Sequence, residues 1–149
     1  MTIKKPLALI NPLSSFVIQN KALMALITEL ELDDVLKFSE IEYSHFLPTF
    51  MDKSQISYPF VAEPTWGREG KEVEIFKQAG EMINNPSSEY SHLYKIYQQY
   101  VDMPLIEIQE ETYTLQLSCF LINGIPEGVG ARIGKDLITN TSKFLPIGY

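Results

Sequence analysis

The stretch TYTLQLSCFLI, residues 112–122, alternates between apolar and polar side chains with a period of two. Successive side chains of a strand point to opposite faces, so this pattern predicts an antiparallel strand with one buried and one solvated face. The only cysteine of the chain lies on the apolar face, and we therefore expect a buried, unreactive thiol. That face consists of Tyr113, Leu115, Leu117, Cys119 and Leu121.

A second alternating run precedes this strand and predicts its partner. Residues 105–109 also alternate, and Glu110-Glu111 separates the two runs as a turn. Further upstream, residues 56–62 are typical of a strand, but Pro59 cannot donate a backbone hydrogen bond and favours a place at the edge of a sheet. The sequence thus predicts a small antiparallel sheet formed mainly by the C-terminal third.

The first two-thirds of the chain show helical spacing instead. Apolar residues recur at steps of mainly three and four within residues 14–32, 73–83 and 86–101, and much of the last stripe is tyrosine. Asn85 can cap the third of these helices, and a proline at position 86 suits a first helical turn. We therefore predict an α+β fold, a single globular domain over residues 1–149, whose mostly helical N-terminal two-thirds packs on the sheet.

The composition excludes several classes of function. The formal net charge is −7, which argues against nucleic acid as a partner because phosphate binding needs a basic face. No stretch approaches the roughly 20 apolar residues that a membrane span requires. A single cysteine permits no intrachain disulfide and lacks the spacing of a zinc site, which favours a reducing, cytoplasmic compartment.

Acidic residues gather in two places and suggest an interaction surface. Six of them fall within residues 29–42, where Lys37 is the only base, and four more fall within residues 102–111, where there is no base. Such a surface suits a basic partner, because its field speeds association. Trp66, in the predicted loop EPTWGREG, is the kind of aromatic residue that anchors interfaces.

These features predict a non-enzymatic protein-binding domain. We expect an acidic inhibitor or immunity-type protein that neutralises a toxin or enzyme, such as a basic nuclease, with no catalytic residue, cofactor or metal and with an oligomeric state that the sequence leaves open. The expected partner-binding residues are Glu29, Glu31, Asp33, Asp34, Glu40, Trp66, Arg68, Glu110 and Glu111.

The segment CFLINGIPEGVGARIGKDL, residues 119–137, supports an alternative function. An apolar strand enters Gly124-x-x-x-Gly128-x-Gly130, and apolar residues then recur as on a helix. This turn resembles the coenzyme-binding turn of short-chain dehydrogenases, which implies glycines that let the backbone approach a pyrophosphate at a helix N-terminus. Only 19 residues (149 minus 130) follow Gly130, too few for a further βαβ unit. The alternative is therefore a nucleotide-binding protein or enzyme fragment that uses residues 124–134.

The tetrapeptide EYSH occurs twice, at residues 42–45 and 89–92, and contains both histidines of the chain. Glutamate and histidine three residues apart share one face of a helix, and two such pairs occur in the di-metal sites of ferritin-like bundles. A metal-binding protein is thus a further alternative. Pro48 ends any helix that begins at Ser39, however, and the second copy opens its predicted helix, so local structural roles are the preferred interpretation.

Overall fold

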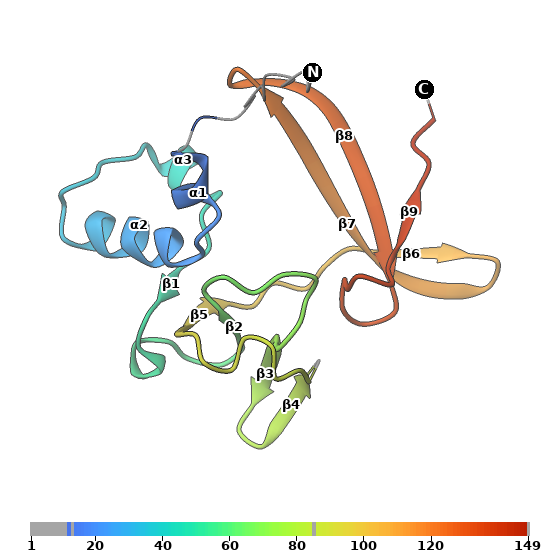
Figure 1. Ribbon diagram of the computed structural model, residues 1–149, viewed down its shortest axis with the longest axis horizontal. Coiled ribbons are helices and arrows are strands. Elements are labelled where there is room, and N and C mark those ends of the chain that lie inside the picture. The colour runs from blue at the N-terminus through green and yellow to red at the C-terminus, as the bar shows by residue number, and fades with distance from the viewer. Residues whose placement is uncertain (1–11, 13, 85, 149) are drawn as a thin grey trace, which may run out of the picture.

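The computed structural model describes residues 12, 14–84 and 86–148, and in it two antiparallel sheets lie beside a group of short helices (Figure 1). The first sheet has the order β1-β5-β2-β3-β4, and the second has the order β6-β7-β8-β9. The helices are α1 Ser15–Ile18, α2 Ala22–Leu32, α3 Glu40–Tyr43 and the 3-10 helix η1 Lys53–Gln55. The strands are β1 Thr49–Phe50, β2 Phe60–Pro64, β3 Glu74–Gln78, β4 Glu81–Asn84, β5 Lys95–Gln99, β6 Leu105–Ile108, β7 Glu111–Ile122, β8 Ile125–Gly134 and β9 Lys143–Leu145.

The predicted α+β fold with a mostly helical N-terminal two-thirds is wrong, because the described elements after Pro48 are strands apart from the 3-10 helix η1. Residues 73–83 form the β3–β4 hairpin rather than a helix, and Gly80 in its turn has a φ of 85°. Residues 86–101 form a loop followed by β5, and the expected cap Asn85 lies outside the described residues. Tyrosine and isoleucine are common in strands and can also form the apolar stripe of a helix. Their spacing alone therefore does not distinguish a helix from a strand.

Strand β2 lies in the middle of the first sheet, not at the predicted edge. It pairs with β5 on one side and with β3 on the other, and Pro59 precedes its first residue, so the missing N–H falls outside the ladder. Phe60 and Ile96 are each 1% exposed, and the ring of Phe60 stacks on that of Phe76 with centroids 4.8 Å apart. Strands β2 and β5, which contain Phe60 and Ile96, therefore hold the core of the first sheet.

The predicted N-terminal helix is confirmed, although it is broken into α1 and α2 at residues 19–21. Helix α2 packs beside β1, where the Oγ1 of Thr28 accepts a hydrogen bond of 3.1 Å from the N–H of Thr49. Ser39 caps α3 in a capping box with Glu42, and α3 ends before Pro48 as its sequence predicts.

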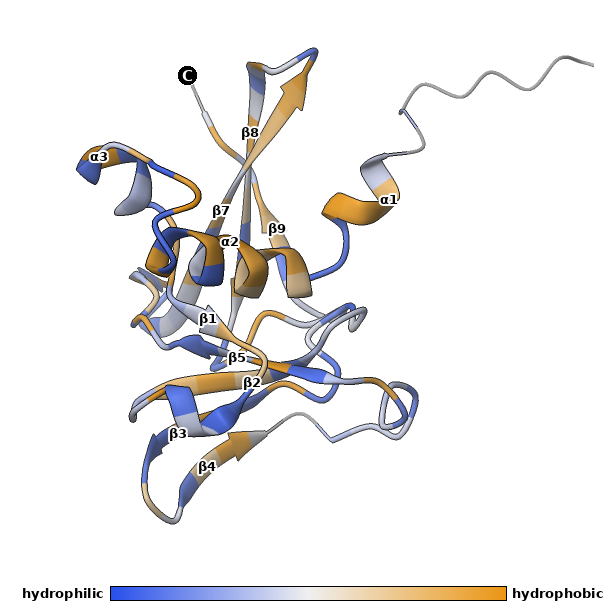
Figure 2. Cartoon of the chain, turned by 90° about the vertical axis from the view of Figure 1, so that its left-hand side faces the viewer, coloured by the Kyte–Doolittle hydropathy of each residue, from blue (hydrophilic) through white to orange (hydrophobic). Residues whose placement is uncertain are grey.

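The strand predicted over residues 112–122 is confirmed as β7, and it pairs with β6 as expected. Asn123 and Gly124 form the two-residue turn into β8, with φ values of 52° and 79°. Among the described elements, β6 and β9 pair only with the inner half of this hairpin, so its outer half projects from the sheet (Figure 1). Leu117 and Leu121 are each 64% exposed, Cys119 is exposed rather than buried as predicted, and Figure 2 shows the hydrophobic end of β7.

In the part of the chain that the structure describes, no helix is both long enough and apolar enough to cross a membrane.

Candidate functional site

A glycine-rich loop, which we define as residues 66–71 (WGREGK), joins β2 to β3 and folds tightly. Gly67 packs on Pro64, and a Cβ atom at Gly67 would lie 3.2 Å from that ring. Glu69 and Gly70 adopt left-handed backbone conformations, with φ values of 59° and 67°. The N–H of Lys71 donates to the carbonyl of Arg68 at 3.1 Å. Two basic side chains and two glycines thus share one compact turn.

The first end of this loop is tied to the segment between α1 and α2. The Nζ of Lys21 donates to the carbonyl of Gly67 at 2.6 Å and forms an ion pair of 3.2 Å with Glu63. Burial raises the pKa of Glu63, and the nearby Lys21 charge opposes that rise. The guanidinium group of Arg68 donates to the side chain of Gln19 at 2.8 Å. The charge of Lys21 is therefore engaged by Glu63 and by backbone carbonyls.

A second loop, residues 135–142 between β8 and β9, meets the glycine-rich loop. A Cβ atom at Gly70 would lie only 2.6 Å from the carbonyl oxygen of Ile138, so no side chain fits there. The Oγ of Ser142 accepts a hydrogen bond of 2.8 Å from the N–H of Thr139, and the hydroxyl groups of Thr139 and Thr141 lie 2.9 Å apart. The contact at Gly70 therefore brings a loop of the first sheet against a hydroxyl-rich loop of the second.

Arg132 stands on β8 next to the second loop. Its Nη2 donates to the carbonyl of Thr139 at 2.5 Å, and its guanidinium carbon lies 5.5 Å from the ring centre of Phe144. Its Nε is buried and has no hydrogen-bond partner among the described residues. A buried donor of this kind is costly unless an acceptor meets it, and a guanidinium group suits phosphate or carboxylate. Arg132 therefore carries one buried N–H without a partner beside the second loop.

A cavity of about 320 Å³ lies between the two sheets and ends at the second loop. Its apolar side chains include Ile75, Ile83, Met103 and Leu137, and its polar lining includes Lys77, Tyr100, Asp102 and Lys135. Burial raises the pKa of the Tyr100 hydroxyl, and a hydrogen bond to Asp102 adds to that rise. A neighbouring cavity of about 460 Å³ shares Ile83 and residues 135–137. The cavity therefore combines apolar side chains with two lysines and two aspartates.

This combination suits a ligand with a flat apolar part and an anionic part. Small-molecule sites in proteins are mostly apolar pockets with a few polar groups that fix orientation. Backbone N–H groups of a glycine-containing turn and an arginine fork are common recognition elements for phosphate. A nucleotide is one ligand that has both parts.

The structure does not gather the predicted partner-binding residues on one surface. Glu29 and Asp33 line a cavity of about 390 Å³ with Asp52, whereas Asp34 forms an exposed ion pair of 3.1 Å with Lys37. Glu31 accepts a weak hydrogen bond of 3.4 Å from the N–H of Phe38, and Glu40 begins α3.

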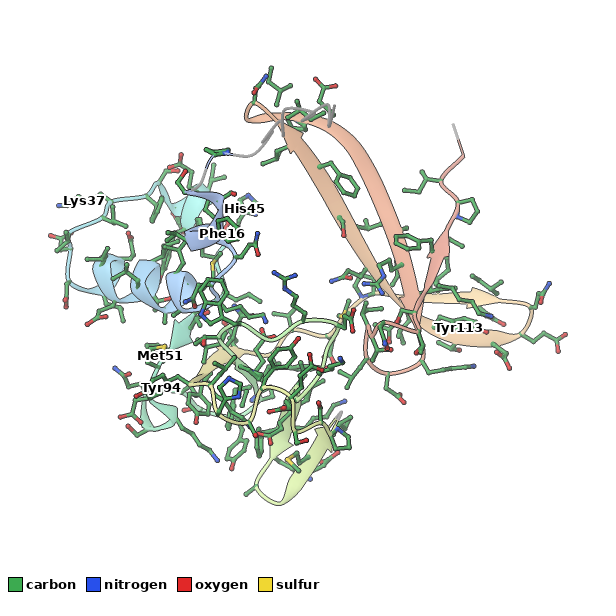
Figure 3. All side chains as sticks on the ribbon, viewed as in Figure 1. Phe16, Lys37, His45, Met51, Tyr94 and Tyr113 are labelled. Atoms are coloured by element: carbon green, nitrogen blue, oxygen red, sulfur yellow. The ribbon has the colours of Figure 1, made fainter. Side chains whose placement is uncertain are left out.

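The remaining predicted residues lie elsewhere. Trp66 and Arg68 belong to the glycine-rich loop, Glu110 occupies the turn before β7, and Glu111 pairs with Lys135 at 2.9 Å. Figure 3 shows Lys37 at one end of the molecule and Tyr113, whose hydroxyl group donates to Glu111, at the other. Of the nine, only Trp66 and Arg68 lie in the site described above.

The glycines at positions 124–134 do not form the predicted coenzyme turn. Gly124 closes the β7–β8 hairpin, and Gly128 and Gly130 lie within β8, where the ring of Phe120 covers them. A strand rather than a helix follows, so no helix N-terminus is available for a pyrophosphate. The missing Cβ atoms instead make room for Phe120, whose ring would be 3.3 Å from a Cβ atom at Gly130.

The two EYSH copies have separate local roles. In the first, Glu42 accepts hydrogen bonds from the backbone and hydroxyl group of Ser39, and these bonds lower the pKa of Glu42. In the second, Glu89 forms an ion pair of 2.6 Å with Lys71. Among the described residues, no group of three or more histidine, cysteine, aspartate or glutamate side chains is placed to hold a metal ion. Figure 3 shows His45 among the helices.

Sequence reasoning named Trp66 and Arg68 but missed the other residues of this site. Gly67 and Gly70 lie three residues apart, with Arg68 between them and Lys71 after them, and this spacing indicates a tight turn. Arg132 gives no such signal, because its environment depends on the second loop folding back over β8.

Comparison with known proteins adds one finding. A family model described as glutathionylspermidine synthase preATP-grasp matches residues 1–148, and no curated protein matches the chain. The prediction of a non-enzymatic immunity-type inhibitor that neutralises a toxin is therefore wrong, because the matching family is described by an enzyme. The alternative of a nucleotide-binding protein or enzyme fragment agrees better with the match. The glycines of residues 124–134, on which that alternative relied, do not form a binding turn.

Proposed function

Because the chain belongs to the glutathionylspermidine synthase preATP-grasp family, we propose that it provides a nucleotide-binding surface for an ATP-dependent synthase. The base of the nucleotide occupies the cavity between the two sheets, and the phosphates lie where the glycine-rich loop meets residues 135–142. The family description supports an association with an ATP-dependent synthase, because it names the synthase and the part that precedes its ATP-grasp fold. The name also contains glutathione and spermidine, which we take as candidate substrates.

The shape of the cavity supports the placement of the base. Ile75, Ile83 and Leu137 offer apolar contacts on strands and a loop that belong to different sheets. A planar base between such side chains buries apolar area, which stabilises binding by about 25 cal/mol for each Å². Lys77 and Asp102 at the same cavity supply a donor and an acceptor for the base edge.

The buried and unpaired Nε of Arg132 is the observation that carries the proposal. A phosphate oxygen suits the guanidinium charge of Arg132, and it reaches the Nε only when the contacts that bury this atom open. Gly70, which contacts Ile138 without a side chain, keeps the glycine-rich loop within reach of the same place. The hydroxyl groups of Thr139 and Thr141 offer further donors to phosphate oxygens.

Isothermal titration calorimetry with Mg-ATP tests this function. We expect saturable binding to the wild-type chain, and a loss of affinity of roughly tenfold or more in Arg132→Ala, because hydrogen bonds to a charged group are worth about 1.5–3 kcal/mol. Arg132→Lys keeps the charge but lacks the guanidinium fork, and should restore only part of the affinity. Circular dichroism confirms that each variant is folded.

Lys37→Ala is the matched control, because it removes one exposed positive charge at the far end of the molecule. It should bind Mg-ATP as the wild-type chain does. A flat titration of the wild-type chain at millimolar nucleotide, or equal losses in Arg132→Ala and Lys37→Ala, would contradict the proposal.

We also propose a cytoplasmic location for the chain. The single cysteine, which permits no intrachain disulfide, supports a reducing compartment, and ATP is available there. Fractionation of host cells followed by immunoblotting tests it, and recovery in the membrane or extracellular fraction would contradict it.

A further inference from the structure

The glycine-rich loop and the residue after it contain three left-handed backbone conformations within four positions. Glu69, Gly70 and Glu72 have φ values of 59°, 67° and 57°. Glycine adopts this region freely, but a residue with a Cβ atom does so at a cost and persists there only where surrounding contacts hold it. The conformation of the loop therefore depends on specific anchors at its glutamates.

Glu72 has such an anchor. It is 7% exposed, and its Oε1 accepts a hydrogen bond of 2.7 Å from the backbone N–H of Tyr90. A buried carboxylate is expensive without a partner, so this bond fixes both the side chain and the backbone that carries it. The partner comes from the second EYSH copy, which lies in the segment between β4 and β5.

Glu69 offers a contrast within the same loop. Its backbone has nearly the same φ, but its side chain is 51% exposed, and its ion pair with Lys71 is 3.6 Å long. The stronger ion pair of Lys71 with Glu89 is also at the surface, where such pairs contribute little. Of the acidic contacts of this loop that we describe, the one from Glu72 is the buried one.

We propose that Glu72 is a positioning residue, which holds the glycine-rich loop in the conformation that faces residues 135–142. The bond to the Tyr90 N–H fixes the C-terminal end of the loop, as Lys21 fixes the N-terminal end through the carbonyl of Gly67. The consequence for phosphate binding rests on the proposed function. The anchoring itself is independent of any ligand.

Trp66, the only tryptophan of the chain, lies in this loop and reports on it directly. It is 39% exposed, so acrylamide quenching of its fluorescence can rise or fall with loop position. The experiment compares Glu72→Ala, Glu72→Asp and Glu72→Gln with the wild-type chain, first without nucleotide and then with Mg-ATP. Glu69→Ala is the matched control, because it makes the same substitution at nearly the same φ without breaking a buried bond.

We expect stronger Trp66 quenching in Glu72→Ala and in Glu72→Asp, whose shorter side chain no longer reaches the Tyr90 N–H. Glu72→Gln keeps an acceptor oxygen and should restore the wild-type value. Loss of one buried hydrogen bond should also weaken Mg-ATP binding roughly three- to tenfold. If Glu72→Ala does not fold, Glu72→Asp against Glu72→Gln gives the same comparison.

Unchanged quenching in Glu72→Ala and Glu72→Asp, or an equal change in Glu69→Ala, would overturn the role of Glu72. The proposed function fails if the wild-type chain binds no Mg-ATP. The role of Glu72 still holds in that case if Trp66 becomes more accessible in Glu72→Asp and not in Glu72→Gln. The two failures are therefore distinguishable.

Discussion

Thr28 joins helix α2 to the first sheet through one hydroxyl group. The side chain is 2% exposed, accepts a hydrogen bond from the N–H of Thr49 and donates one of 3.1 Å to the carbonyl of Met24. Thr49 is fully buried, so its N–H has no access to water if that acceptor is removed. Threonine is a poor helix former, and this bond explains why it occupies the middle of α2.

Replacing Thr28 by valine should therefore destabilise the protein despite the nearly equal size of the two side chains. The variant leaves the Thr49 N–H without its acceptor, and we expect the free energy of unfolding to fall by about 1–3 kcal/mol. Thr28→Ser keeps the hydroxyl group and should lose less. Urea denaturation measures both, and an equal or greater loss in Thr28→Ser would show that packing rather than the hydrogen bond decides.

Glu63 gives the protein a pH dependence of known sign. Burial raises its pKa above the ordinary value of 4.5, so the folded protein binds this proton more tightly than the unfolded chain does. Its contribution to the free energy of unfolding is therefore fully present below the unfolded pKa and is lost as pH rises through the folded pKa.

The free energy of unfolding of the wild-type chain should fall as the pH rises above the ordinary glutamate pKa. Glu63→Gln should make this fall less steep. Urea denaturation of the variant and the wild-type chain between about pH 4 and pH 8 measures the difference in slope. Glu81→Gln, at an exposed position on β4, controls for the loss of one carboxylate. Parallel curves for Glu63→Gln and the wild-type chain would contradict this assignment.

At the scale of elements, the sequence predicts β7 correctly and the segments before it poorly. The period of two over residues 112–122 is long, and its partner β6 is close in sequence, so the strand and its pairing are predicted. Its predicted buried face is wrong, because Leu117 and Leu121 are exposed whereas Thr114 on the opposite face is buried. Residues 73–83 have apolar spacing that fits a helix, but Ile75 and Phe76 pair with Val61 and Phe60 of β2. That pairing is decided by a distant segment, which a local pattern cannot contain.

Gly134 shows how one position controls an element. A Cβ atom there would lie 2.5 Å from the carbonyl oxygen of Leu137 and 3.0 Å from the Oγ of Ser142, so Gly134→Ala must displace the loop 135–142. We expect a loss of about 1–3 kcal/mol in the free energy of unfolding, as in overpacked cores, together with weaker Mg-ATP binding.

Gly128→Ala on the same strand is the control, since its Cβ atom would make only an ordinary contact of 3.8 Å with Phe120. Thermal unfolding compares the two variants. A midpoint for Gly134→Ala that equals that of Gly128→Ala would show that the loop accommodates the methyl group without cost.

At the scale of the whole molecule, the candidate site is a product of two sheets that are separate in sequence. Gly70 lies in a loop of the first sheet, whereas Ile138 lies in a loop of the second sheet and Arg132 on its strand β8, and nothing local links them. Sequence reasoning finds Trp66 and Arg68 because they stand in a recognisable loop, but assigns them to a partner surface. Net charge does not reveal the site either, because its basic groups pair with acidic ones, as Lys71 does with Glu89 and Lys135 with Glu111.

The same arrangement predicts how a nucleotide changes the stability of the molecule. Among the described elements, extensive contacts occur within each sheet and between α2 and β1, whereas the strands of different sheets do not pack extensively on each other. The two sheets should therefore open by separate local transitions in the absence of ligand. A nucleotide that contacts both sheets should couple these transitions and, at 100 times its dissociation constant, add about 2.7 kcal/mol of stability.

Hydrogen exchange measured by mass spectrometry resolves the two sheets, because peptides from β2 and β5 report on the first and peptides from β7 and β8 on the second. Without nucleotide we expect two distinct levels of protection. With Mg-ATP both levels should rise together in the wild-type chain and should rise less in Arg132→Ala at the same nucleotide concentration. Protection gained by only one sheet would mean that the nucleotide binds there alone and does not bridge the contact between Gly70 and Ile138, because a bridging ligand must be released before either sheet opens.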